Sequence, residues 1–237
     1  MAVDRALLER AQQGEWWLRL YRWAPHCLSF GRHEPALRRY DRSRIEALGL
    51  DVVRRPTGGR AVWHADELTY ALAVPDGVLG GLRESYHEIH RMLLLALLHL
   101  GVPAAVAPAA RALRLDAGAC FAAPVGGEIV SGERKLVGSA QLREGGALLQ
   151  HGSILLRGRQ GIVGDVTAGG GPPDLAGSLA DATGREVPWR DVAEAVTAAA
   201  EACWGGVWER SAVAGDLLDE AARHEPTFRS PAWTWRS

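Results

Sequence analysis

The hydrophobic residues of this chain follow two spacings, and each spacing predicts a different element. Over residues 3–13 they recur every three or four positions, which predicts a short amphipathic helix that ends at Gly14. Around residues 18–20, 27–30 and 68–74 they alternate with small or polar residues, which predicts strands. The first third of the chain therefore combines one helix with several strands.

Longer helices are predicted further along. Residues 86–100 are apolar almost all round, so we expect a buried central helix, and Ser85 with Glu88 three residues later matches a capping box at its start. An alanine-rich helix is predicted over residues 188–204 and a shorter one near residues 215–224.

Between these helices lies the densest run of strand signals. Residues 128–131, 134–143 and 147–156 are separated by glycine-bearing turns, which predicts a three-stranded meander. With a two-residue loop at the second turn, Gln141 faces Gln150 across the last hairpin, and Ser139 faces Gly152.

On that register Lys135, Val137, Ser139 and Gln141 share one face of the middle strand. A polar face flanked by valine, leucine and glycine is unusual for a core. We therefore expect this face to form the wall of a pocket.

Composition excludes several classes of protein. The chain has 237 residues, 47% hydrophobic and 23% charged, with a formal net charge of −1, which is typical of a globular protein and lacks the basic excess of a dedicated nucleic-acid binder. Its longest apolar run, residues 92–98, is far shorter than a membrane span, and the first residues lack the apolar core of a signal peptide. We expect a cytoplasmic protein with no nucleic-acid or membrane partner.

Length favours a single domain over residues 1–237, with a core of about residues 1–165 and a helical accessory part of about residues 185–237. The three cysteines, Cys27, Cys120 and Cys203, are widely spaced and odd in number. They fit neither a disulfide framework nor a zinc site, so we predict free thiols and no metal.

A loop with glycines and arginines is the first candidate for chemistry. Residues 54–60 read RRPTGGR, and paired glycines with exposed amides and arginines suit an anion or a close backbone approach to a ligand. A turn with solvated arginines is the more frequent explanation of such a run. On its own the loop is a weak signal.

Cys120 and Lys135 form the second candidate. Lys135 is the only lysine of the chain, beside 26 arginines. A nearby ammonium lowers the pKa of a cysteine and stabilises the anion that forms when a thiolate attacks a carbonyl. Burial as a small hydrophobic residue is the usual role of an isolated cysteine, and we assign it to Cys27 and Cys203.

The histidines give weaker signals. His87 and His90 are three residues apart, whereas a zinc-protease helix needs a spacing of four, so both are interpreted as ordinary polar positions of a helix. His151 lies on the predicted meander, where it could orient a substrate or serve the structure.

Three segments together carry a resemblance to a known family. RRPTGGRAVWHADELTYAL (54–72), GACFAAP (118–124) and GERKLVGSAQLREGGALLQHGSILL (132–156) resemble the lipoate/biotin protein ligase superfamily, and within it the cysteine-dependent octanoyltransferase branch. The opening helix, residues 18–34 and the FRSPAWTW tail are also similar, so the resemblance runs through most of the chain.

This resemblance implies an α+β fold with a mixed β-sheet and flanking helices, akin to class II synthetase cores. It implies that Cys120 is the acyl-accepting cysteine and Lys135 the lysine shared by the superfamily. The implied substrate-binding residues belong to the glycine-bearing loop and to the opposite pocket wall. They are Arg54, Arg55, Thr57, Gly58, Gly59, Arg60, His64, Gly138, Ser139, Ala140, His151 and Gly152.

The implied reaction moves an octanoyl group from acyl carrier protein to a specific lysine of a lipoyl domain or of the glycine-cleavage H protein. The acyl group passes from one thioester to another and then to an amine, so no cofactor is required.

Alternatives remain at this stage. An ATP-dependent lipoate ligase, which would need ATP and Mg²⁺, shares the fold and needs no cysteine, and a lipoyl-protein amidotransferase also uses a cysteine. A catalytically inactive module that binds lipoyl domains belongs to a different class, and the presence of both Cys120 and Lys135 argues against it.

Overall fold

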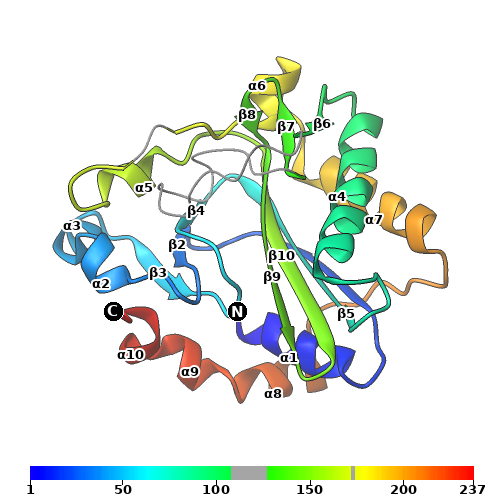
Figure 1. The fold of residues 1–237 in the computed structure, drawn as a ribbon, viewed down its shortest axis with the longest axis horizontal. Coiled ribbons are helices and arrows are strands. Elements are labelled where there is room, and N and C mark those ends of the chain that lie inside the picture. The colour runs from blue at the N-terminus through cyan, green and yellow to red at the C-terminus, as the bar shows by residue number, and fades with distance from the viewer. Residues whose placement is uncertain (108–126, 172–173) are drawn as a thin grey trace.

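The computed structural model describes residues 1–107, 127–171 and 174–237. Its largest sheet has the strand order β1-β5-β10-β9, and every pairing in it is antiparallel (Figure 1). The strands are β1 (Trp17–Tyr21), β5 (Glu67–Pro75), β9 (Val137–Glu144) and β10 (Ala147–Leu155). β5 and β10 are buried along almost their whole length because helices cover both faces of the sheet.

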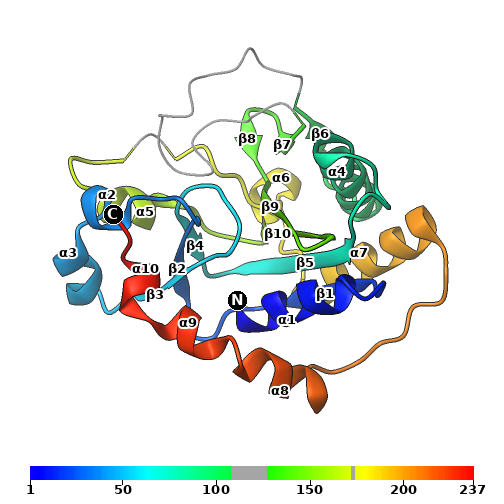
Figure 2. The ribbon, with the colours of Figure 1, turned by 60° about the horizontal axis from the view of Figure 1, so that its bottom comes forward.

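Helices α4 (Leu82–His99) and α7 (Trp189–Trp204) pack on one face of this sheet, and α1 (Ala2–Ala11) and α8 (Asp216–Ala222) pack on the other (Figure 2). The alternation of β5 explains both contacts, since Tyr70 and Leu72 enter the larger core while Ala71 and Ala73 contact α1.

The start of α4 differs from the sequence prediction. The helix begins at Leu82, and Oε2 of Glu84 accepts a hydrogen bond of 2.6 Å from the Gly81 N–H. The predicted capping box of Ser85 and Glu88 is therefore wrong, because both residues lie inside the helix.

The predicted register of the last hairpin is confirmed. Gln141 pairs with Gln150 and Ser139 with Gly152. The predicted middle strand is interrupted, however, because β8 (Arg134–Lys135) ends before Leu136 and β9 begins after it. Lys135 pairs with Val130 of β7 (Ile129–Ser131) in a separate small sheet of order β6-β7-β8, where β6 is Ala105–Val106.

A second sheet of order β3-β2-β4 lies beside the main one. Its strands are β2 (Cys27–Phe30), β3 (Asp51–Arg54) and β4 (Val62–His64), and β2 runs parallel to β3 and antiparallel to β4. Helices α2 (Ala36–Arg39), α3 (Arg42–Ala47) and α5 (Gly161–Asp165) surround it. The described residues therefore combine antiparallel sheets and one mixed sheet with flanking helices, as the predicted α+β class requires.

The remaining helices are α6 (Leu179–Thr183), α9 (Glu225–Arg229) and α10 (Pro231–Thr234). α7 belongs to the largest hydrophobic cluster, and α8 packs on α1. The residues predicted to form an accessory part thus contact the cores of the main sheet. Within the described ranges, no helix is both long and apolar enough to cross a bilayer.

Candidate functional site

A cavity lies between the main sheet and the second sheet. Its described lining combines aromatic, small and hydrogen-bonding residues. They are Met1, Tyr21, Trp23, Arg55, Val62, His64, Thr69, Gly138, Ser139, Ala140, His151, Gly152 and Ser153. The structure therefore brings Arg55 and His64 to the same cavity as Gly138, Ser139, Ala140, His151 and Gly152. The other predicted residues of the glycine-bearing loop, namely Arg54, Thr57, Gly58, Gly59 and Arg60, are not among the lining residues.

A chain of hydrogen bonds ties the glycine-bearing loop to the main sheet. His151 Nε2 lies 2.5 Å from Thr57 Oγ1, and His151 Nδ1 lies 3.2 Å from Asp4 Oδ2. Burial lowers the pKa of His151 although Asp4 opposes this shift, so the ring is neutral near pH 7. Nδ1–H then donates to Asp4, and Nε2 accepts from Thr57. His151 thus positions the loop, and neither of its nitrogens is left to transfer a proton.

His64 is held by a second buried cluster. Its Nδ1 lies 2.7 Å from Glu67 Oε1, and its Nε2 lies 2.6 Å from Ser29 Oγ. Ser153 and Thr69 also donate to the same Glu67 oxygen. These contacts join strands of both sheets, so the cluster fixes the separation of the two cavity walls.

Trp23 covers this cluster on the cavity side. Its ring stacks on the His64 ring with centroids 4.5 Å apart, and its Nε1–H donates to Thr69 Oγ1 at 3.0 Å. The cavity therefore has an aromatic surface next to His64 and Thr69, whose side chains hydrogen-bond within the protein.

The two arginines at the start of the loop have different surroundings. Arg55 lines the cavity and donates to Ser29, Gly58 and Arg60, which closes the loop on itself. Arg54 is fully buried and does not line the cavity; it donates to the backbone carbonyls of Gly31, Arg32 and Glu34 and to Thr234 O in α10. In this structure Arg54 anchors the C-terminal residues and is not in contact with the cavity.

A glycine that the sequence analysis did not select sets the position of the loop. A Cβ on Gly31 would lie 1.8 Å from the Gly59 carbonyl oxygen, whereas a Cβ on Gly58 would meet nothing within 4 Å. Gly59 itself has a φ of 84°, which favours glycine. The loop thus packs directly on the backbone after β2.

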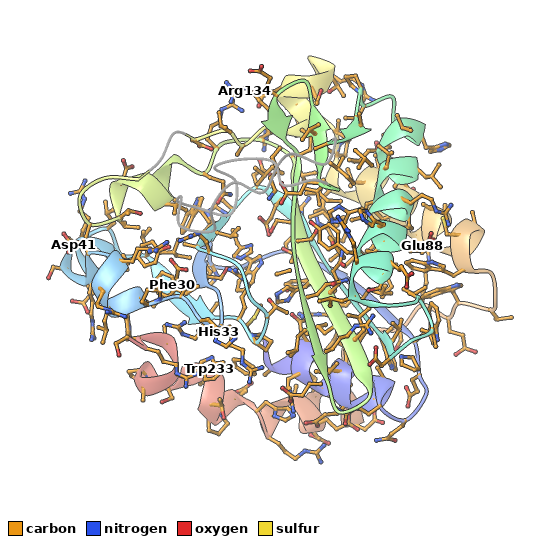
Figure 3. The ribbon with its side chains drawn as sticks, viewed as in Figure 1. Phe30, His33, Asp41, Glu88, Arg134 and Trp233 are labelled. Carbon is orange, nitrogen blue, oxygen red and sulfur yellow. The ribbon has the colours of Figure 1, made fainter. Side chains whose placement is uncertain are left out.

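Lys135 lies outside the described cavity lining, and its ammonium forms a buried ion pair with Glu128. The two side chains are 3% and 7% exposed, which requires the charges to be paired. The neighbouring Arg134 is exposed and lies at the outer edge of the molecule (Figure 3). Cys120, the predicted acyl acceptor, lies outside the described residues, so its distance from Lys135 stays a prediction.

The predicted pocket face of the middle strand is partly wrong. Val137 belongs to the hydrophobic core, and Gln141 contacts Ser85 of α4 and Gln150. Gly138 and Ala140, which point to the opposite face of β9, line the cavity together with Ser139. The break at Leu136 separates Lys135 from the alternation of β9, and the sequence pattern gave no sign of this break.

Gly152 is also required by packing. A Cβ there would lie 2.4 Å from the Gly138 carbonyl oxygen and 2.8 Å from both Ser139 Oγ and Tyr70 Cε1. β9 and β5 can approach this point of β10 only because no side chain is present.

The interpretation of His90 as an ordinary polar position is wrong. Its side chain is buried, and its two nitrogens contact Gly127 O at 2.6 Å and Ser139 Oγ at 2.8 Å. Glu88, by contrast, is partly exposed on the outer side of α4 and pairs with Arg91.

Sequence reasoning missed several cavity residues, namely Tyr21, Trp23, Val62, Thr69 and Ser153. Thr69 and Ser153 did carry a signal, because a hydroxyl on the inward face of an otherwise apolar strand needs a partner. Glu128 carried one too, as an acidic residue directly before the apolar run of β7. Among the described residues no cluster of three or more histidine, cysteine, aspartate or glutamate side chains could hold a metal.

Curated relatives of this chain are bacterial octanoyltransferases. It is 42% identical over 163 residues to octanoyltransferase LipM of Moorella thermoacetica, and 44% identical over 162 residues to the same enzyme of Carboxydothermus hydrogenoformans. Each match covers 66% of this chain and 60% of the relative. The chain thus matches less than two thirds of the length of these relatives.

Solved structures confirm the fold. A crystal structure of lipoate-protein ligase A bound with ATP superposes with a TM-score of 0.85 at 19% sequence identity, covering 99% of this chain and 92% of that one. The sequence profile of the lipoyl protein ligase A/B catalytic domain matches residues 1–201. This chain therefore belongs to the lipoyl protein ligase A/B catalytic domain family.

Proposed function

We propose that this protein transfers an octanoyl group from acyl carrier protein to a lysine of a lipoyl-accepting protein, in the biosynthesis of lipoate. The observation that carries this proposal is the cavity between the two sheets, whose walls hold Arg55, His64, Gly138, His151 and Gly152, combined with the 42–44% identity to octanoyltransferases. The acceptor is a lipoyl domain or the glycine-cleavage H protein.

The reaction proceeds in two steps through Cys120. The Cys120 thiolate attacks the carbonyl carbon of the donor thioester, a new carbon–sulfur bond forms, and the carrier leaves as a thiolate. The amine of the acceptor lysine then attacks the same carbon, the amide forms, and the Cys120 thiolate leaves while the amine loses a proton to solvent. An amide is more stable than a thioester, so no nucleotide is consumed.

The cavity supports this chemistry by its rigidity and its surface. The Thr57–His151–Asp4 chain and the Glu67 cluster fix the two walls, so little ordering is needed when the acyl chain binds. Each buried methylene contributes about 0.8 kcal/mol. Gly138, Ala140 and Gly152 give the cavity lining small residues from β9 and β10.

Lys135 supplies the positive charge. In this proposal its ammonium stabilises the oxyanion that develops on the acyl carbonyl, and Glu128 keeps the ammonium in one position. A lysine carries a compact charge, whereas an arginine would present a wider planar group.

The proposal is tested by intact mass spectrometry after incubation with octanoyl-loaded carrier protein and no ATP. We expect an adduct of one octanoyl group that is absent in Cys120→Ser and present in Cys27→Ser, the matched control. A protein that forms no adduct, and instead modifies the acceptor only with ATP and free lipoate, would be a ligase. Transfer from an octanoylated lipoyl protein but not from carrier protein would identify an amidotransferase.

A further inference from the structure

His90 connects two parts of the molecule that the sequence places far apart. It projects from α4 and is 1% exposed. Its Nε2 contacts Ser139 Oγ in the cavity wall, and its Nδ1 contacts the Gly127 carbonyl oxygen. A leucine would fill a buried helix position without the cost of desolvating an imidazole, so the two polar contacts need an explanation.

The direction of each hydrogen bond follows from the partners. Burial lowers the pKa of His90 to about 4, so the ring is neutral near pH 7. A carbonyl oxygen only accepts, which places the ring proton on Nδ1 and makes Nε2 the acceptor from Ser139. Ser139 Oγ then accepts from Tyr70 OH at 2.7 Å, and Tyr70 accepts from Gln150 Nε2 at 2.7 Å. Each side chain in this series thus donates to the next one, from Gln150 of the main sheet to the Gly127 carbonyl oxygen, which accepts the last hydrogen bond.

Gly127 lies where two stretches of the chain that are distant in sequence are hydrogen-bonded to each other. We call Ala107, Gly127 and Glu128 the neck. The Gly127 N–H donates to the Ala107 carbonyl at 3.1 Å, and the Ala107 N–H donates to the Glu128 carbonyl at 2.7 Å. Residues 107 and 127 flank the segment that contains Cys120. The next residue, Glu128, holds the Lys135 ammonium.

The neck fits closely against α4. Gly127 has a φ of 95°, and a Cβ there would lie 2.9 Å from His87 Cε1. The carbonyl of this glycine therefore meets His90 in one defined backbone conformation, and Glu128 follows in a fixed direction.

We propose that His90 is a positioning residue for the proposed acyl transfer: its Nδ1–H bond to Gly127 sets the place of the Glu128–Lys135 pair and of the neck relative to the cavity wall at Ser139. This inference rests on the proposed function for its catalytic consequence. Its structural part, the dependence of Lys135 on His90, stands independently.

Two substitutions separate the two nitrogens of the ring. The side-chain amide of His90→Asn places an N–H near the position of Nδ1 and retains the bond to Gly127. The longer His90→Gln places its amide near Nε2 and retains only the contact with Ser139. Positioning through Gly127 predicts that Asn substitutes for histidine and that Gln does not.

Lys135 reports its own position because the chain has no other lysine. Protein labelled with ¹³Cε-lysine gives a single lysine methylene signal in an NMR spectrum, and this signal needs no assignment. We expect the wild type and His90→Asn to coincide and His90→Gln to be shifted. His99→Gln, at the exposed end of the same helix, is the matched control and leaves the signal unchanged.

The kinetic test uses the same four proteins and octanoyl-loaded carrier protein. A misplaced catalytic group costs up to about a hundredfold in rate, so we expect kcat of His90→Gln to fall about tenfold or more with KM unchanged, and His90→Asn to stay near wild type. Thermal unfolding of the wild type and the three variants identifies any loss of fold. Should His90→Gln fail to fold, Ser139→Ala, which leaves the Gly127 bond intact, replaces it and must leave the lysine signal unchanged.

Equal effects of Asn and Gln, or an unshifted lysine signal in His90→Gln, would overturn the inference. A wild type that forms no octanoyl-Cys120 would instead refute the proposed function, while the NMR comparison would still decide the role of His90.

Discussion

Thr57 Oγ1 lies 2.5 Å from His151 Nε2, and this contact joins the glycine-bearing loop to the central strand β10. The two residues are 94 positions apart in the sequence, and both are buried. Because the neutral imidazole accepts this hydrogen bond, the position of the loop over the cavity depends on one hydroxyl.

Removing that hydroxyl should release the loop. Thr57→Val keeps the shape of the side chain but leaves His151 Nε2 without a donor, which costs about 1–3 kcal/mol in unfolding free energy. We expect a lower melting temperature and a higher KM for the octanoyl donor, whereas Thr57→Ser stays close to wild type in both. A Thr57→Val protein with unchanged KM and stability would show that the contact does not position the loop.

Close packing at Gly31 predicts that alanine lowers the stability of the protein at Gly31 but not at Gly58. Gly31→Ala places a methyl group 1.8 Å from the Gly59 oxygen, so the loop must move, at a cost of about 1–3 kcal/mol in stability. Gly58→Ala meets nothing within 4 Å and should unfold at the wild-type temperature. Thermal unfolding measures both, and equal melting temperatures for the two variants would contradict the packing argument.

The buried pair of Lys135 and Glu128 predicts a coupling between these residues. Lys135→Met leaves the Glu128 carboxylate buried without its ammonium, which should cost about 3–5 kcal/mol. Adding Glu128→Gln should recover much of this loss in unfolding free energy, although octanoyl transfer stays absent in the double variant. Chemical denaturation of the wild type, both single variants and the double variant gives the coupling energy, and strictly additive effects would argue against a buried ion pair.

His90 predicts a pH dependence of stability. Its pKa is lowered by burial from 6.5 to about 4 in the folded protein, so the unfolded chain binds this proton more readily. The folded state must therefore lose stability as the pH falls from about 6.5 to about 4, by roughly 3 kcal/mol in total. Burial also lowers the pKa of His151, which adds to the loss in the same direction.

A substitution isolates the contribution of His90. His90→Asn lacks the titrating group, so its unfolding free energy should fall less than that of the wild type between about pH 7 and pH 4. Denaturant titrations at several pH values provide the comparison. Parallel curves for the two proteins would rule out His90 as a source of the acid sensitivity.

The sequence was most informative where local chemistry determines the backbone. Two adjacent glycines between alternating segments gave the register of β9 and β10, including the opposition of Gln141 and Gln150. Glycines after the apolar helical patterns likewise located the ends of α1 and α4 to within a few residues.

The second sheet was harder to predict because its strands are short and two of them make parallel contacts over four residues only. Arg54 illustrates a further limit. An arginine beside glycines suggests an anion site, and only the fold reveals that carbonyls from the residues after β2 and from α10 surround its guanidinium.

The candidate site could be predicted in part from spaced motifs. Thr57 and His151, which belong to motifs 94 residues apart, are in contact. Only His151 lines the cavity. The roles of His90 and Glu128 were not predicted. His90 contacts Gly127 and Ser139, which are distant from it in sequence. The role of Glu128 depends on a single local ion pair, with Lys135.

The central claim is that Cys120 carries the octanoyl group between two proteins. Octanoyl-loaded enzyme, separated from the donor and free of nucleotide, is mixed with a lipoyl domain, and the masses of both proteins are followed over time. The account predicts that the octanoyl adduct leaves the enzyme at the rate at which it appears on the acceptor lysine. An adduct that stays on the enzyme, or an acceptor that gains mass only when ATP is supplied, would contradict it.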